Sequence, residues 1–340
     1  MTITNEVQLE ELLAQPSDAD VRAMAALEGD LLILGVAGKM GPSLAHRAAL
    51  ASAAAGVRKR IIGVARFSTP EVEQQLRDWG IETVAADLLE PGALSRLPDA
   101  ANVIHMAARK FGSTGNEGLT WAMNTHLPGL VADRYRGSRI VAFSSGNVYP
   151  LTPVLHGGPT ESAPVGPVGE YAQSVLGRER IFAYYSQRDG TPVALLRLNY
   201  AIDLRYGVLL DIGRKVFERR PVDLRMGHAN VIWQGDANSI CLRAFPLCQC
   251  PPAILNLTGP ETLAVRWAAH RFGAHFGLEP ILEGSEGETA LLNNASRCQQ
   301  LFGYPSVSLE QLVEWTAGWI QSGGATWNKP THFETRDGKF

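Results

Sequence analysis

Residues 31–41 constrain the fold of this chain more than any other stretch, because four bulky apolar residues precede three evenly spaced glycines. The apolar run predicts a buried parallel strand, and Gly35, Gly38 and Gly41 predict a tight turn into a helix through about residue 55. In dinucleotide-binding turns such glycines permit the turn, the approach of a diphosphate and close helix packing. The spacing is GxxGxxG rather than GxGxxG, so an ordinary strand–helix turn is the alternative. The candidate cofactor-binding residues of this loop are Gly35, Gly38, Lys39, Met40 and Gly41.

Strand and helix signals alternate along the first 200 residues. Further strands are expected at 60–65, 81–86, 102–107, 139–144 and 192–198, with helices at 70–79, 121–135 and 171–187. This alternation is typical of an α/β protein with a Rossmann-type, doubly wound parallel sheet. The sequence therefore predicts a dinucleotide-binding domain over residues 31–200.

The rhythm changes after Asn199. Helices are expected at 206–220, 236–245, 262–277 and 308–321, and extended segments at 228–234 and 253–257. This pattern predicts a smaller mixed α/β lobe over residues 201–322, which would bind substrate. Residues 1–30 are expected to form a leader with a helix capped by Asp18 or Asp20. Residues 323–340 are expected to form a polar tail across the surface or a neighbouring subunit.

Composition excludes several classes of protein. The net charge of −3 and the 19% of charged residues give no general attraction to nucleic acid or to anionic membranes. No apolar run approaches the roughly 20 residues of a spanning helix, and the acidic N-terminus does not resemble a signal peptide. Cys248 and Cys250 lack a companion pair for zinc, so no metal site is expected. Four reduced cysteines indicate the cytoplasm.

Small and polar residues gather where three further strands are expected to end. Asp87 and Leu88 follow one strand, and the Asp87 carboxylate could accept a hydrogen bond from an adenine amino group. His105-Met-Ala-Ala108 ends another, with Ala107 and Ala108 small enough for a ribose to pass close to the backbone, whereas His105 is expected to be a core residue. Ser144-Ser145-Gly-Asn-Val-Tyr149 ends a third. Ligands bind at the carboxyl edge of such sheets.

With these motifs in order, the chain resembles the extended short-chain dehydrogenase/reductase superfamily, specifically its NAD-dependent epimerase/dehydratase group. The resemblance covers about residues 31–321. It rests on the motifs at 35–41, 87–88, 103–108 and 143–149, and on Asn124, Tyr171, Asn199, the run 256–261 and the run 301–303.

The resemblance implies roles for individual residues. Tyr171 would be the catalytic acid/base, and Ser145 would hydrogen-bond the reacting oxygen while a hydride passes between the nicotinamide and a substrate carbon. Asn124 would brace the active-site helix and belong to the cofactor site. The candidate substrate-binding residues are Asn147, Asn199, Arg205 and Arg109, although Arg109 and Lys110 could also form a solvated loop edge. The family also implies a homodimer that pairs helices 121–135 and 171–187.

One residue departs from the family pattern at the centre of the site. Val175 stands where the family has a lysine four residues after the tyrosine. An ordinary tyrosine has a pKa near ~10, so about one phenol in a thousand is ionised at neutral pH. Arg178 lies on the same helical stripe and could supply part of the missing charge, although solvation or an ion pair is the simpler expectation. A dinucleotide-binding sensor or scaffold without redox turnover is therefore one alternative.

Two further departures concern the ligands. Residues 229–236 lack the arginine with which relatives bind nucleotide sugars, so a small sugar, sugar acid, lactone or polyol is expected as the substrate. Arg66 follows the second strand where NAD-binding proteins have an acid, so NADP is favoured over NAD. Lys39 is expected to add positive charge nearby. A lyase or isomerase that uses its cofactor transiently is the other alternative.

Overall fold

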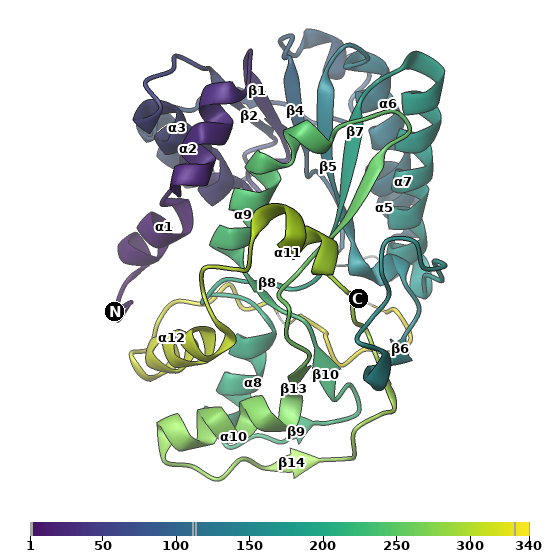
Figure 1. Ribbon diagram of the computed structural model, residues 1–340. Helices are drawn as coiled ribbons and strands as arrows, with labels where there is room; N and C mark the ends of the chain where they lie inside the picture. Colours follow the sequence, from purple (N-terminus) through teal and green to yellow (C-terminus); the bar gives the residue numbers. More distant parts are fainter. Residues whose placement is uncertain (1–2, 111, 113, 330, 340) are drawn as a thin grey trace.

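The computed structural model describes residues 3–110, 112, 114–329 and 331–339. Its centre is a parallel sheet of seven strands in the order β12-β7-β5-β4-β1-β2-β3 (Figure 1). The strands are β1 (Leu31–Leu34), β2 (Ile61–Ala65), β3 (Glu82–Ala85), β4 (Asn102–His105), β5 (Arg139–Ser145), β7 (Val193–Leu198) and β12 (Ala253–Leu257). The predicted doubly wound parallel sheet is confirmed.

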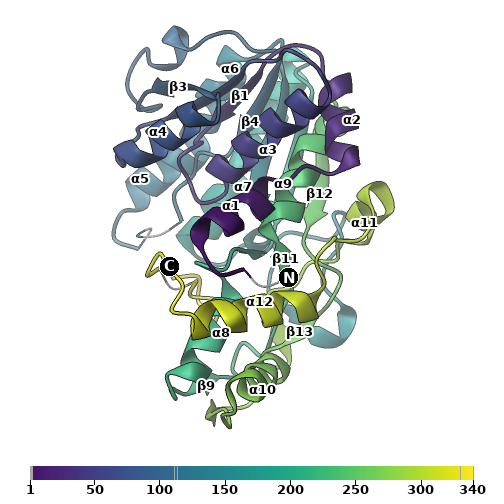
Figure 2. The ribbon, with the colours of Figure 1, turned by 90° about the vertical axis from the view of Figure 1, so that its left-hand side faces the viewer.

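Alternate residues of each buried strand face opposite layers of helices, because side chains in a strand point to the two faces in turn. Leu31 and Ile33 belong to the core cluster that contains α3, whereas Leu32 and Leu34 belong to the cluster that contains α6 and α7. Figure 2 shows α3 and α4 in front of the sheet. The helices that cover the two faces are α3 (Gly41–Ala54), α4 (Pro70–Asp78), α5 (Glu117–Trp121), α6 (Leu127–Arg134), α7 (Gly169–Asp189) and α9 (Gln234–Arg243).

The leader packs against the glycine-loop side of the sheet. It forms α1 (Glu6–Ala14) and α2 (Asp18–Ala26), and both contact α3 and α9. Ser17 caps α2, and Asp20 completes the capping box from the third position of the helix. The Asp20 carboxylate also forms a buried ion pair with Arg47 of α3, at 2.8 Å. The expected caps, Asp18 and Asp20, therefore lie inside the helix.

The smaller lobe lies beyond the carboxyl ends of the strands. Its helices are α8 (Val208–Phe217), α10 (Val265–Phe276), α11 (Ser296–Phe302) and α12 (Leu309–Gln321). Its short strands are β6 (Thr152–Pro153), β8 (Ala201–Ile202), β9 (Val222–Asp223), β10 (His228–Ala229), β11 (Ile232–Trp233), β13 (Leu263–Ala264), β14 (Leu282–Glu283) and β15 (Thr289–Ala290). Helices α8, α10 and α12 contact one another around Phe272 and Trp319.

Three features differ from the expected pattern. Strand β12 lies late in the chain but pairs with β7 in the central sheet, and α9 packs on α3. Residues 234–257 of the expected lobe therefore complete the larger unit. The helix expected at 121–135 begins at Glu117 and contains a π-helical turn, η2 (Ala122–His126), between α5 and α6.

The short 3-10 turns of the described chain are η1 (Leu94–Arg96), η3 (Gly146–Val148), η4 (Val154–His156) and η5 (Phe245–Leu247).

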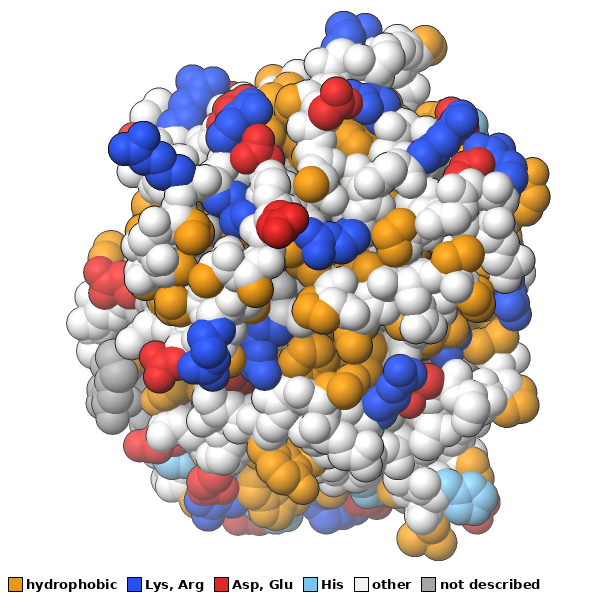
Figure 3. Space-filling view, turned by 45° about the horizontal axis from the view of Figure 1, so that its top comes forward, with side chains coloured by type: hydrophobic (Ala, Val, Ile, Leu, Met, Phe, Trp, Pro, Cys, Tyr) orange, Lys and Arg blue, Asp and Glu red, His pale blue; other side chains and the backbone are white. Residues whose placement is uncertain are grey.

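Charged side chains on the surface are largely arranged in pairs of opposite sign. Around the face in Figure 3, Lys and Arg side chains lie beside Asp and Glu side chains. Arg60, for example, contacts Asp30 and Glu82. In the described part of the chain, no helix is long and apolar enough to cross a membrane. The four cysteines are all free thiols.

Candidate active site

The glycine loop joins β1 to α3 at the carboxyl edge of the sheet. Gly35 has a φ of +89°, and a Cβ atom there would lie 2.6 Å from the backbone nitrogen of Ala107. A Cβ atom on Gly41 would lie 2.0 Å from the carbonyl oxygen of Val36. The loop itself thus requires these two glycines. Gly38 is exposed, as is Ala37, and its Cβ would meet only the oxygen of Gly35, at 3.3 Å.

The residues around this loop fit the diphosphate and ribose of a dinucleotide. The exposed backbone at Ala37 and Gly38 stands at the N-terminus of α3, where N–H groups and the helix dipole favour an anion. Met40 is the N-cap residue of α3 and is buried. At the end of β4, Ala107 is buried and Ala108 is exposed. A side chain at Gly38 would fill the space in front of the loop.

The other predicted cofactor residues lie at the same edge. Asp87 is exposed after β3, and its carboxylate accepts a hydrogen bond from the Leu89 N–H at 3.0 Å. Leu88 is buried behind it. Arg66 is exposed at the carboxyl end of β2. These strand ends are adjacent because β3, β2, β1 and β4 are neighbours in the sheet.

Tyr171 lies in the first turn of α7 and faces the end of β5. Its phenol hydrogen-bonds to Ser145, whose hydroxyl also donates to Asn147 Oδ1 at 3.0 Å. Burial raises the pKa of Tyr171 above its ordinary value, while the charge of Arg178 and the hydrogen bond to Ser145 act to lower this pKa. The structure therefore brings Tyr171, Ser145 and Asn147 together, as the sequence predicts.

A second cation faces Tyr171 from the loop after β4. The Lys110 ammonium lies 5.9 Å from the centroids of both the Tyr171 and the Tyr200 rings. Burial lowers the pKa of Lys110 to about 8. The sequence is compatible with Arg109 and Lys110 either at a solvated loop edge or at the site, and Arg109 is the candidate substrate residue of the two. The Arg109 guanidinium instead donates to the carbonyl oxygen of Gly112, so Lys110 is the member of this pair beside Tyr171.

Asn124 links three segments of the site from within the π-helical turn. Its side chain accepts from the backbone N–H of Arg109 at 2.9 Å and donates to the Arg109 carbonyl at 2.8 Å. Its amide also donates to Ser174 Oγ of α7 at 3.0 Å. Asn124 is fully buried. These contacts hold the Arg109–Lys110 loop against the helix that carries Tyr171.

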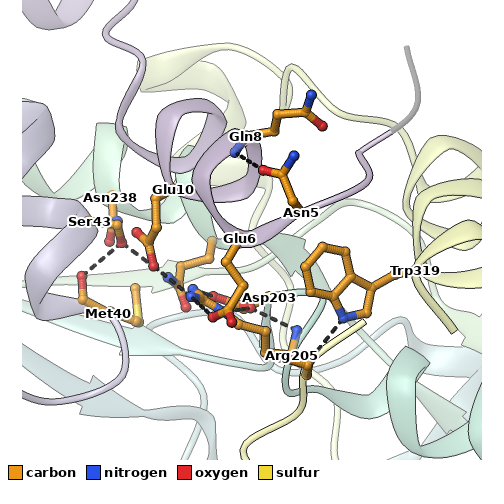
Figure 4. Close-up of polar contacts among 12 residues, drawn as sticks. Asn5, Glu6, Gln8, Glu10, Met40, Ser43, Asp203, Arg205, Asn238 and Trp319 are labelled. Carbon is orange, nitrogen blue, oxygen red and sulfur yellow. Dashed lines mark hydrogen bonds and ion pairs between the residues drawn. The ribbon is translucent and has the colours of Figure 1, made fainter. Parts of the chain in front are cut away.

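Two candidate substrate residues occupy structural positions instead. Arg205 is 6% exposed and pairs with Asp203, Glu10 and Glu6 (Figure 4), so carboxylates of the protein already occupy its guanidinium. The pairs with α1 could not be read from the sequence, because the partners are about 195 residues away. Asn199 is also buried, and its side-chain amide donates to the carbonyl oxygen of Leu291 at 3.5 Å. Its backbone N–H donates to the Leu257 carbonyl, and its own carbonyl accepts from the Thr258 hydroxyl.

Lys39 extends away from the Arg66 side of the loop. Its ammonium donates to the carbonyl oxygen of Ala201 at 2.5 Å and lies 4.2 Å above the ring of Tyr206. Ala201 follows β7, on the opposite side of β1 from β2. The expectation that Lys39 adds charge near Arg66 is therefore wrong. His105 is a core residue as expected, and neither ring nitrogen has a hydrogen-bond partner among the described residues.

The tail forms one wall of a hollow beside Tyr200. Gly338 packs on Val168 and Gly169, immediately before Tyr171, and the Arg336 guanidinium donates to the carbonyl oxygen of Thr289 at 2.8 Å. The cavity volume of this hollow is about 30 Å³, which is room for about one water molecule. Its lining residues are Asn147, Tyr149, Leu151, Val168, Tyr200, Leu291, Thr335, Arg336 and Gly338. The expected surface tail thus packs against the start of α7 and lines this hollow.

Residues 31–202, just over half of the chain, match the model of the NAD dependent epimerase/dehydratase family. The chain belongs to this family. The match spans the glycine loop, Ser145, Tyr171 and the first strand after Asn199. The family membership predicted from the sequence motifs is confirmed.

Several solved structures share the fold of this chain. UDP-glucose 4-epimerase of Thermotoga maritima superposes with a TM-score of 0.69 at 15% identity, covering 86% of this chain and 99% of that chain. UDP-glucuronic acid 4-epimerase of Bacillus cereus, solved with NAD, has a TM-score of 0.71 at 17% identity, with coverages of 86% and 96%. The Thermus thermophilus UDP-glucose 4-epimerase complex with NAD has a TM-score of 0.69 at 17% identity, covering 86% of this chain and 99% of that chain. No curated protein sequence is significantly similar to this chain.

Proposed function

We propose that this family member is an NAD(P)-dependent oxidoreductase or epimerase that acts on a small carbohydrate-like substrate. The observation that carries the proposal is the hydrogen-bonded pair of Tyr171 and Ser145, at the same sheet edge as an exposed glycine loop. A bound nicotinamide dinucleotide would supply the hydride acceptor or donor for a substrate carbon. The chain itself would supply the matching proton.

Tyr171 is the proposed proton carrier. For reduction of a carbonyl, the neutral phenol donates its proton to the forming alkoxide, and the burial that raises the Tyr171 pKa keeps the phenol neutral for that step. For oxidation, the phenolate removes the hydroxyl proton. Ser145 hydrogen-bonds the reacting oxygen in both directions, and Asn147 holds the Ser145 hydroxyl.

The proposed substrate is a sugar, sugar acid, lactone or polyol without a nucleotide. The stretch 229–236 lacks the arginine with which relatives bind nucleotide sugars, and its first two residues, Ala229 and Asn230, are both buried. The Asn230 amide donates to the Glu261 carbonyl, so it serves the lobe itself. The relatives named above act on UDP-sugars, so UDP-glucose and UDP-glucuronic acid belong in the test panel.

For the cofactor we propose NADP over NAD. Arg66 is an exposed guanidinium at the end of β2, and a guanidinium is well suited to receive a 2′-phosphate. Calorimetric titration with both dinucleotides tests the preference. Tighter binding of NADP that Arg66→Ala removes supports it, whereas equal or tighter NAD binding contradicts it.

The proposed mechanism predicts that Tyr171→Phe reduces kcat by at least about 100-fold, because the variant lacks the proton-transferring hydroxyl. The expected binding of the dinucleotide is within about threefold of the wild type. The assay follows nicotinamide absorbance and product formation over the substrate panel. Tyr304→Phe, at a position 77% exposed, is the matched control and should retain full activity. Turnover by Tyr171→Phe at the wild-type rate would remove the mechanism.

A dinucleotide-binding sensor is the second candidate, and Val175 favours it. Val175 is fully buried against Val148 and Tyr149, so it brings no charge to the phenol. Tight dinucleotide binding without turnover, both in the wild type and in Val175→Lys, would support the sensor. Product formation without net change of the cofactor would instead indicate an epimerase, lyase or isomerase.

A further inference from the structure

Arg178 is a buried cation that pairs with no carboxylate in the described part of the chain. It is 2% exposed. Its guanidinium donates to Phe143 O at 2.7 Å, Asn124 Oδ1 at 2.9 Å and Asn124 O at 3.2 Å. The carboxylate of the adjacent Glu179 is bound by Arg197 at 2.7 Å. Burying a charge without a counter-ion is costly, so the position of this guanidinium calls for a functional explanation.

Helix geometry brings Arg178 back toward Tyr171. The two residues are seven positions apart, so they share one face of α7. Long helical side chains point toward the helix N-terminus, which carries the Arg178 guanidinium toward the preceding turn. Val175 occupies that turn and packs on Val148 and Tyr149. The guanidinium therefore lies between the end of β5 and the π-helical turn, where its charge acts on the Tyr171 phenol.

Other titratable groups face Tyr171 from the surrounding segments. Lys110 lies over its ring from the loop after β4, and Tyr200 and Tyr206 interact with it from the segment after β7. His105, on β4, is kept neutral by burial and by the charge of Arg178, which lower its pKa. Arg178 and Lys110 are therefore the two cations near the phenol, and only Arg178 is on the helix of Tyr171.

We propose that Arg178 supplies the positive charge that stabilises the Tyr171 phenolate, in place of the lysine whose position Val175 occupies. The proposal rests on the proposed function, in which Tyr171 is the acid/base. Arg178 remains protonated throughout and acts through Tyr171, so it is a positioning residue. The proton itself moves only between the substrate oxygen and the phenol.

The decisive experiment measures the ionisation of residue 171 without substrate. A fluorinated tyrosine replaces Tyr171, which lowers the phenol pKa into an accessible range, and fluorine NMR follows this single label against pH. We expect Arg178→Met to raise the midpoint by about one pH unit or more, a tenfold smaller ionised fraction at a given pH. Arg178→Lys should keep the midpoint close to that of the wild type.

A relocated cation is the matched control. Arg178→Met combined with Val175→Lys should restore the midpoint, because the charge returns to the turn next to Tyr171. Lys110→Met measures the contribution of the other cation. An unchanged midpoint in a folded Arg178→Met protein overturns the proposal, as does a shift of equal size in Arg178→Lys. If Arg178→Met does not fold, Arg178→Gln takes its place, because the glutamine amide can still donate a hydrogen bond toward Phe143 O or Asn124 Oδ1 but carries no charge. An unchanged midpoint in that variant overturns the proposal in the same way.

Activity separates this inference from the proposed function. If the midpoint moves as expected but no substrate of the panel turns over, the role of Arg178 stands and the proposed function fails. If turnover depends on Tyr171, but neither its pH profile nor the fluorine midpoint changes in Arg178→Met, the proposed function stands and this inference fails. In the supported case, the alkaline shift of the oxidation pH profile in Arg178→Met matches the fluorine shift.

Discussion

Single residues in this site are controlled by burial more than by their neighbours in sequence. Lys39 follows a glycine and would be a solvated loop residue in most chains. Here its ammonium is enclosed near Ala201 and Tyr206, and burial lowers the pKa of Lys39 to about 7. The attraction of Asp203 opposes that change. A lysine that is half deprotonated near neutral pH makes folding depend on pH.

The lowered pKa of Lys39 predicts that the protein becomes more stable as pH rises from 7 to 9. In this window the unfolded chain, with an ordinary lysine pKa of about 10.4, binds more protons than the folded chain, so the free energy of unfolding increases. Between these two pH values, we expect the free energy of unfolding to increase by about 1–2 kcal/mol less in Lys39→Met than in the wild type. Urea unfolding at pH 7 and at pH 9 measures the free energy of unfolding of both proteins. Parallel pH curves for the two proteins would contradict this prediction.

Sequence alone located the proposed catalytic pair but not all of its surroundings. Tyr171 and Ser145 are recognisable from motif order, because each stands at a definite distance from a strand end. The sequence suggests Arg205 as a substrate residue, whereas in the structure its guanidinium pairs with Glu6 and Glu10, from a helix near the other end of the chain. The charges around a side chain depend on tertiary contacts that local patterns do not contain.

At the scale of elements, the glycines of the strand–loop–helix unit differ in whether protein atoms leave room for a side chain. Gly41 contacts the backbone of Val36 so closely that a Cβ atom cannot be accommodated, whereas Gly38 faces outward. The same motif thus contains one glycine required by packing and one that leaves room for a ligand. Sequence predicts both glycines but does not distinguish their tasks.

The two glycines predict opposite phenotypes for the same small substitution. Gly41→Ala should lower the free energy of unfolding by about 2 kcal/mol or more, because the backbone must shift to relieve the clash. Gly38→Ala should stay within about 1 kcal/mol of the wild type and weaken dinucleotide binding at least about tenfold, since its methyl group projects into the cradle. Thermal unfolding and calorimetric titration measure the two effects. Equal losses of stability would refute the distinction.

Elements also show where periodicity misleads. The pattern at 121–135 predicts one helix, yet the chain forms a π-helical turn that aims Asn124 at Arg109 and Ser174. The extra residue in such a turn is not visible in apolar spacing, because the flanking turns keep the helical period. Strand β12 was correctly expected, but its pairing with β7 follows only from the folded topology.

At the scale of the whole molecule, segments near both ends of the described chain pack on residues that follow β7 or precede α7. Helix α1 contributes Glu6 and Glu10 to the ion pairs of Arg205, and the tail lies between the small lobe and the start of α7. The homodimer implied by the family remains a prediction. The exposed side chains of Trp121, Leu130 and Tyr184 on α5, α6 and α7 are those that it would cover.

The packing of the tail predicts that Gly338→Ala releases its end. The residue has a φ of +72°, and a Cβ atom would lie 2.2 Å from the carbonyl oxygen of Val168. We expect trypsin to cleave after Arg336 at least about fivefold faster than in the wild type, as measured by mass spectrometry. Gly318→Ala has no atom within 4 Å to disturb and is the control. Identical cleavage rates would show that Gly338 does not hold the tail.

The sequence by itself determined the parallel α/β sheet, the glycine loop and the positions of Tyr171 and Ser145, because these depend on local periodicity and on motifs next to strand ends. Only the tertiary structure decided which charges surround the phenol, since Lys110, Arg178 and Arg205 take their partners from segments distant in sequence. The same is true of β12 and of the tail at the start of α7. Burial and contacts between distant segments arise only when the chain folds.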